Sequence, residues 1–231
     1  TEEFNRDMAP MKDGHTDNYY YQLVSNVRKY KGMNAPVKFL QPNKIKVDGN
    51  FKDWANVEPE FYDPIGDTMH RDFAGYDPKT NYKNDTGRND IISAKVGLGK
   101  KDVFFYVKTE NKLTNFKDDK WMLLFIDVDK DISTGWEGYD YVVNYEIKSS
   151  RKSTLKKWNG TSWTDAGKLS YKKNKNEIEL CVSKKDINLK ENADFYFKWA
   201  DNPIELKDVT TFFMNGDTAP DRRFKYHFKE N

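Results

Sequence analysis

Short segments in which apolar and polar residues alternate recur from Ile45 to the C-terminal end of the chain, and they restrict the fold more than any other pattern. Alternation with a period of two places apolar side chains on one face of a β-strand. Turns rich in Gly, Asn and Asp separate about ten such segments, and no convincing helix lies between them. The pattern predicts an all-β fold, an antiparallel β-sandwich of the jelly-roll type.

One segment differs from the others because it is apolar on both faces. WMLLFIDV (residues 121–128) has no polar residue before Asp127, as expected of a central strand that is covered on each side. The other expected strands are KIKVDG, NDIISAKVGLG, DVFFYVKTEN, YDYVVNYEIKSS, TLKKWNG, TSWTDAGKLSY, NEIELCVSKK, ADFYFKWADN and RRFKYHFKE.

Composition excludes some functions. Aromatic residues make up 15% of the 231 residues, which suits strands. The 39 basic and 37 acidic residues are interspersed, so no basic block favours nucleic acid or an anionic membrane as a partner. No apolar run is long enough for a membrane-spanning helix. Cys181 is the single cysteine, so no intrachain disulfide forms.

Residues 1–36 have a different character. A helix is predicted from Asp17 or Asn18, which can cap it, to Gly32, which ends it. Its apolar residues recur at helical spacing, and an extended linker follows. We interpret residues 1–36 as the tail of a preceding domain and residues 37–231 as the β-sandwich.

The run Val47-Asp48-Gly49, with Trp54 five residues after the glycine, resembles the opening of family 9 carbohydrate-binding modules and related DOMON-like sandwiches. The resemblance continues through DVFFYVKTEN, WMLLFIDVDKDISTGWEGYDYVVN, FKWADN and NGDTAPDRRFKYHF, and it spans roughly residues 40–231. It implies a DOMON-like β-sandwich that binds oligo- or polysaccharide and holds structural calcium.

The segment EEFNRDMAPMKDGHTDNYYYQLVSNVRKYKG resembles the tail that precedes such modules in glycoside-hydrolase-like proteins of gut Bacteroidetes. This resemblance implies the C-terminal part of a larger glycan-degrading protein, with a catalytic domain on its N-terminal side. It also implies an extracellular, periplasmic or cell-surface location in a bacterium. Two alternatives stay open: a glycoside hydrolase domain in its own right, and a structural module that braces a neighbouring catalytic domain.

The turn FIDVDKDISTGWEGYDYVVN (residues 125–144) carries the densest group of carboxylates. An EF-hand loop starting at Asp127 would need Gly at position 132 and Glu at position 138, where this chain has Ile132 and Gly138. A looser calcium site needs only converging oxygen ligands, and Asp127 and Asp129 point to the same side of a strand end. The further candidate ligands here are Asp131 and Asp140. Alternatively, these acids only solvate the rim of the sandwich.

Two other segments offer calcium ligands. The polar stretch Asp63–Asn89 has too few apolar anchors to fold by burial, and a divalent ion is one way to order it. Its candidate ligands are Asp67, Asp72, Asp77, Asp85 and Asp90. In NGDTAPDRR, Asp217 is the third candidate, unless Arg222 and its neighbour pair with the acids there.

Tryptophan residues are the main lead to a sugar site, because indole rings stack on the apolar faces of sugars. Trp54 and Trp121 are expected in the core, and Trp158 and Trp163 can pair across a hairpin. Trp136, in a glycine-flanked turn, and Trp199 are the candidate platforms. The polar and aromatic partners expected around them are Tyr139, Asp201, Asn202 and Arg222.

No catalytic arrangement stands out. The carboxylates are too numerous for one pair to be nominated as acid and base. The three histidines are far apart in sequence, and no nucleophile elbow is present. The sequence therefore predicts a chain that is not an enzyme by itself.

Overall fold

The computed structural model describes residues 23, 24, 26, 27, 30, 38–42, 44–68, 72–74, 79 and 81–230. The predicted helix after Asp17 falls mostly outside these residues, but the five of its residues that are described have helical backbone. Asp77 also lies outside the described residues.

Antiparallel strands are the predominant regular structure of the described chain, which confirms the all-β prediction. From residue 38 onward, the described chain has two helical elements: a 3₁₀ helix over Phe51–Asn56 and the short helix α3 (Thr211–Met214). The strands are β1 (Glu60–Tyr62), β2 (Asp72–Ala74), β3 (Asn81–Lys83), β4 (Ile91–Leu98), β5 (Asp102–Thr109), β6 (Leu123–Asp127), β7 (Tyr141–Ser149), β8 (Lys152–Trp158), β9 (Trp163–Asn174), β10 (Glu177–Ser183), β11 (Asp194–Asp201), β12 (Asp217–Ala219) and β13 (Tyr226–Lys229).

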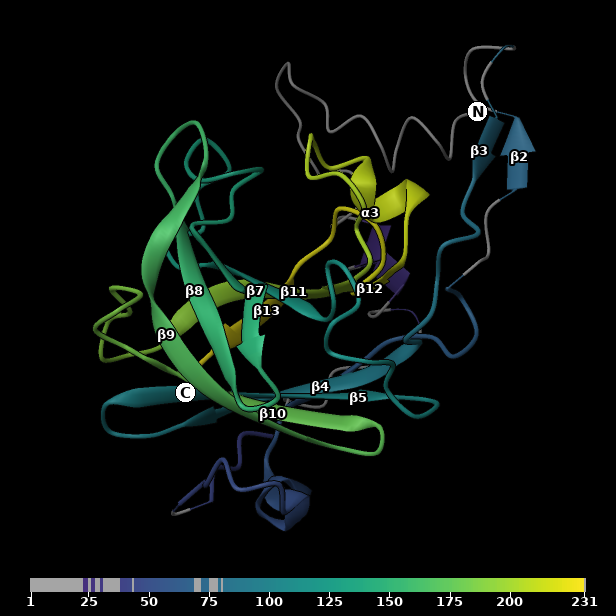
Figure 1. Cartoon of the computed structure of the whole chain (residues 1–231). Coiled ribbons are helices and arrows are strands. Elements are labelled where there is room, and N and C mark those ends of the chain that lie inside the picture. The colour runs from purple at the N-terminus through teal and green to yellow at the C-terminus, as the bar shows by residue number, and fades with distance from the viewer. Residues whose placement is uncertain are drawn as a thin grey trace.

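One continuous sheet forms both layers of the sandwich. Its strand order is β1-β4-β5-β10-β9-β8-β7-β6-β11-β12, and β13 pairs with β11. Figure 1 shows β4, β5 and β10 as a lower layer, with β8 and β9 curving upward on one side. The 12-residue strand β9 makes this bend possible, because its last residues pair with β10 and its first residues pair with β8.

The sheet nearly closes on itself. β12 lies beside the first residues of β4, and the amide of Ile91 donates to Oδ2 of Asp217 at 2.7 Å. Tyr226 of β13 reaches β1 in the same way, through a hydrogen bond from its hydroxyl to the carbonyl oxygen of Tyr62. We call this place, where β12 and β13 lie next to β1 and the start of β4, the seam.

The main apolar core lies between the two layers, and a second apolar cluster covers the outer face of β6. Leu124 and Ile126 point into the main core, whereas Leu123 and Phe125 belong to the second cluster. The prediction of a central strand with two apolar faces is therefore confirmed.

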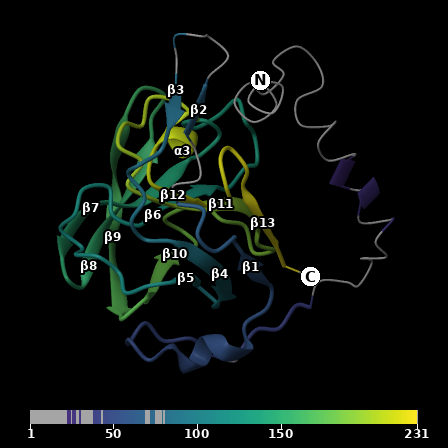
Figure 2. The same cartoon turned by 90° about the vertical axis from the view of Figure 1, so that its right-hand side faces the viewer.

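Some expected boundaries are wrong. KIKVDG, expected as a strand, forms an irregular segment before the 3₁₀ helix. The polar stretch Asp63–Asn89, expected to lack strands, contains the two-stranded ribbon β2–β3, which Figure 2 shows projecting from the body near α3. Tyr82 of β3 contacts Phe213 of α3, with ring centroids 5.8 Å apart.

Candidate functional site

The turn between β6 and β7 brings three of the predicted metal ligands together. Asp127 ends β6, Asp129 lies on the turn and Asp140 immediately precedes β7. One carboxylate oxygen from each lies within 4.8 Å of the other two. Asp140 Oδ2 accepts a hydrogen bond from the amide of Val128 at 2.8 Å, so backbone hydrogen bonds fix the geometry of this group. We call Asp127, Asp129 and Asp140 the turn triad.

A mostly buried lysine, Lys225, partly neutralises the turn triad. Nζ of Lys225 lies 2.7 Å from Asp127 Oδ2, donates to the carbonyl oxygen of Gly138 at 3.0 Å and lies over the ring of Tyr139. Burial lowers the pKa of Lys225, and burial raises the pKa values of Asp127 and Asp140. With one positive charge against three carboxylates, the group keeps the capacity to bind a cation.

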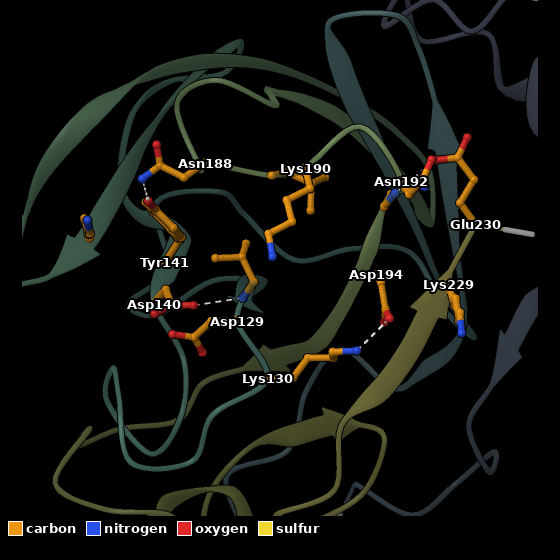
Figure 3. A pocket seen from close by; sticks show the side chains of 14 residues that line it. Asp129, Lys130, Asp140, Tyr141, Asn188, Lys190, Asn192, Asp194, Lys229 and Glu230 are labelled. Carbon is orange, nitrogen blue, oxygen red and sulfur yellow. Dashed lines mark hydrogen bonds and ion pairs between the residues drawn. The ribbon is translucent and has the colours of Figure 1, made fainter.

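A cavity of about 850 Å³ opens beside the turn triad. Figure 3 shows Asp129, Asp140 and Tyr141 on one side of it and Asn192 and Glu230 on the other. Two of the three triad residues therefore also line this cavity.

Many of the side chains that line the cavity are polar, and several form ion pairs or hydrogen bonds with one another. Lys130 Nζ forms an ion pair with Asp194 at 2.6 Å, and Asn188 Nδ2 donates to the hydroxyl of Tyr141 at 3.2 Å. Four lysines (Lys130, Lys157, Lys190 and Lys229) face four carboxylates (Asp129, Asp140, Asp194 and Glu230) around the cavity, so the formal charge of its lining is zero.

A second carboxylate group lies at the seam. It consists of Asp63, which follows β1, Asp67 in the next loop and Asp217 in β12. One oxygen from each lies within 4.8 Å of the other two. We call these residues the seam triad. The predicted ligand Asp217 thus meets the polar stretch Asp63–Asn89, which the sequence had offered as a separate site.

Burial dominates the electrostatics of the seam triad. It raises the pKa values of Asp63 and Asp217 well above the usual range, and the neighbouring carboxylates raise them further. Burial and the charge of Asp221 raise the pKa of Asp67 to about 7. Lys198, buried nearby, donates to the carbonyl oxygen of Pro220, and its burial lowers its pKa.

The predicted aromatic platforms are not accessible. Trp136 is 5% exposed and Trp199 is 0% exposed, so the expectation of exposed indoles is wrong. Trp136 packs against Phe125 and Phe212 in the second apolar cluster. Its turn folds back over the outer face of β6, which local glycine spacing did not reveal.

The side chains expected around those platforms are also mainly structural. Tyr139 is buried, and Asp201 is a buried ion-pair partner of Arg88, whose Nε lies 2.7 Å from Asp201 Oδ2. Asn202 donates to the carbonyl oxygen of Thr86, and Arg222 is half-buried. These residues do not surround a common sugar-sized cavity among those found in the described chain.

Two further predicted metal ligands stay outside both triads. Asp131 is exposed, and hydrogen bonds from Ser133 lower its pKa. Asp72 is exposed on β2 and accepts from the side-chain amide of Asn81 at 3.1 Å.

Sequence reasoning missed several residues of these sites. Asp63 meets Asp217 in the seam triad and Lys225 pairs with Asp127, but these partners are distant in sequence. The third seam residue, Asp67, is already a candidate ligand of the polar stretch. An aromatic surface of half-buried rings also emerges: Trp158 pairs with Trp163 across the β8–β9 hairpin at a centroid distance of 5.3 Å, and Tyr145 lies next to Trp163. The expected pairing of the two tryptophans is confirmed. That these rings together form a partly exposed surface is visible only in the structure, because the sequence does not report their exposure.

Comparison of the chain with protein-family models, with curated proteins and with solved structures finds no match. Among the described residues, no helix has both the length and the apolar character required to cross a bilayer.

Proposed function

We propose that the chain is a non-catalytic carbohydrate-binding β-sandwich that belongs to a larger secreted glycan-degrading protein and holds structural calcium. The observation that carries the proposal is the cavity of about 850 Å³ beside Tyr141. Its volume lies within the range of about 300–1,000 Å³ that is usual for small-molecule sites.

The chemistry of the lining favours a neutral ligand with many hydroxyl groups. Carboxylates such as Asp129 accept hydrogen bonds, ammonium groups such as that of Lys190 donate them, and the amide of Asn192 does both. A sugar hydroxyl also donates and accepts. Because lysines and carboxylates are equal in number around the cavity, a strongly charged ligand would gain little net attraction.

The turn triad fits calcium better than a softer metal. Its donors are carboxylate oxygens, which suit Ca²⁺ and other hard cations, and it contains neither His nor Cys. In this proposal the ion bound by Asp127, Asp129 and Asp140 holds the turn that forms one wall of the cavity. There the ion would compensate the charge of the carboxylates and fix the conformation of the turn, and it would take no part in a chemical reaction.

Calorimetric titration with a panel of plant and host oligosaccharides tests the proposal. We expect dissociation constants of roughly micromolar to millimolar, because the free energy gained from a few hydrogen bonds is largely offset by the free-energy cost of association. The variant Lys190→Ala/Asn192→Ala, which removes two cavity groups, should weaken binding at least tenfold. The matched control Asn111→Ala/Lys112→Ala changes the same residue types at an exposed site outside the cavity and should bind like the wild type.

Two outcomes would count against the proposal. If no oligosaccharide of the panel gave a measurable heat of binding, the result would favour the alternative of a module that braces a neighbouring catalytic domain. Hydrolysis of an aryl glycoside by the pure protein, abolished by Asp140→Asn, would instead favour a glycoside hydrolase.

The parent protein and the location follow from the resemblance described above. We propose that a catalytic domain precedes this module in the same chain and that both act outside the cytoplasm, on the cell surface or in the periplasm. Joined to an enzyme, even a weak sugar-binding module raises the local concentration of substrate at the catalytic domain.

A further inference from the structure

We propose that the seam triad, Asp63, Asp67 and Asp217, binds a divalent cation of the calcium type, and that this ion fastens the two edges of the sheet together. The site is separate from the turn triad, because the two triads share no residue, and none of its three residues lines the proposed sugar cavity. The proposal does not depend on sugar binding.

The first argument is the convergence of the ligands. The three carboxylates come from β12 and from two positions around the end of β1, and one oxygen from each lies within 4.8 Å of the others. Asp217 comes from a segment about 150 residues further along the chain than Asp63 and Asp67. Carboxylates this close repel one another unless a cation or protons lie between them.

The second argument is an oxygen without a partner. Asp63 is 8% exposed, and its Oδ2 atom accepts no hydrogen bond within the described part of the chain. Among the described residues, its Oδ1 atom receives only a long contact of 3.4 Å from the hydroxyl of Tyr226. A buried carboxylate oxygen that makes no hydrogen bond carries a large desolvation cost, and a metal ion directly offsets it.

Nearby carboxylates strengthen the argument. Asp90 immediately precedes β4 and lies close enough to Asp67 and Asp217 to raise their pKa values. Its Oδ1 atom is likewise buried and makes no hydrogen bond in the described chain. Lys198 contributes one positive charge, but its ammonium donates to the carbonyl oxygen of Pro220. Each carboxylate of the seam triad also lies in the negative field of its neighbours, and a divalent ion would compensate this repulsion.

The donor set indicates the class of ion. All the converging groups are carboxylates, which favours a hard cation such as Ca²⁺ or Mg²⁺ over zinc or copper. The ion would link β1 and its following loop to β12, the edge strand at the opposite end of the sheet. β1 and β12 are the two ends of the strand order and are not paired with each other. The ion would therefore join two edges that main-chain hydrogen bonds do not connect.

The test compares bound calcium in four proteins: the wild type and three variants. Each is saturated with CaCl₂, separated from free ion by gel filtration and analysed by elemental mass spectrometry. The seam variant Asp63→Asn/Asp217→Asn should contain one calcium equivalent fewer than the wild type. Asp129→Asn/Asp140→Asn removes the turn triad instead and should retain the seam ion. Asp72→Asn, which changes an exposed carboxylate outside both triads, is the matched control.

Thermal unfolding separates loss of the ion from loss of the fold. In EDTA the seam variant should melt at or above the wild-type temperature, because Asn removes buried charge repulsion and can still accept the hydrogen bond from Ile91. In calcium the wild type should gain several degrees more than the variant. If the double variant does not fold, the single substitution Asp67→Asn is measured in the same way.

Equal calcium content in the wild type and the seam variant would overturn the proposal, as would an equal calcium-dependent rise in melting temperature. Because the turn variant is measured in parallel, failure of the seam site and failure of the proposed turn site give different patterns.

Discussion

Neighbouring carboxylates in this protein differ in pKa according to how much water reaches them. Asp131 is exposed, and hydrogen bonds from Ser133 lower its pKa, whereas Asp127, four residues earlier, is buried and has a raised pKa. Tryptophans differ in the same way, since Trp136 is buried and Trp158 is half-buried. The role of a single residue therefore depends on burial, which a sequence motif reports poorly.

Replacing Trp136 tests its assignment to the core. Trp136→Ala should lower the free energy of unfolding by about 3–5 kcal/mol, because it leaves a cavity among Phe125, Tyr139 and Phe212. Denaturant titration measures the change. Trp158→Ala, the same substitution at a half-buried ring, should cost clearly less. An unchanged unfolding midpoint for Trp136→Ala would show that the indole is not packed as described.

Glu146 gives a prediction about pH. Hydrogen bonds from Lys148 and Lys156 lower its pKa to about 2 from an ordinary value near 4.5. The folded pKa is depressed, so the stabilisation is complete above about pH 4.5 and is lost as the pH falls toward 2.

The expected energy is small because Glu146 is exposed. Glu146→Gln should reduce stability at pH 7 by less than about 1 kcal/mol. Melting temperatures of the two proteins between pH 7 and pH 2 measure the effect, and the difference should disappear at the acid end. A difference that grows as the pH falls would contradict the assignment.

At the scale of elements, β9 and the connection from α3 to β12 shape the molecule. β9 pairs with β10 at one end and with β8 at the other, and so carries the sheet from one layer to the next. The connection from α3 turns at Gly216, which has a φ of +60°, and this turn places Asp217 at the seam.

Gly216→Ala should destabilise the protein by at least about 2 kcal/mol. The backbone there is left-handed, and an added Cβ would lie 1.7 Å from the carbonyl oxygen of Asp201. Gly167→Ala in β9 is the matched control, since its Cβ would meet its nearest neighbour at 4.0 Å. Chemical unfolding of both variants measures the costs. Equal stability of the two variants would show that the turn at Gly216 relaxes freely.

At the scale of the whole molecule, the two carboxylate triads lie near opposite ends of β11. Asp127 of the turn triad pairs with Tyr196 near the start of this strand, and Asp217 of the seam triad pairs with Asp201 at its end. One triad lies beside the cavity and the other joins the sheet edges, so cation binding at both would stabilise the whole sandwich.

Removing divalent ions should therefore lower the melting temperature by several degrees. An ion at 100 times its dissociation constant adds about 2.7 kcal/mol to the stability of the folded state. For a chain of this size, 1 kcal/mol corresponds to roughly 2–4 °C. Calorimetric scans in calcium and in EDTA measure the shift. Identical scans, together with a metal-free elemental analysis, would exclude cation binding at both triads.

The sequence by itself determined the all-β class, most of the strands and the two apolar faces of β6. These features depend on side-chain alternation within a few residues, and local alternation is enough to decide which face of a strand is buried. It also identified the carboxylates of the turn triad, because all three lie on one short connection. Only the tertiary structure decided that Trp136 is covered by Phe212 and that Lys225 pairs with Asp127. It alone brought Asp217 to Asp63, because these contacts join residues between 76 and 154 positions apart and leave no periodic pattern in the chain.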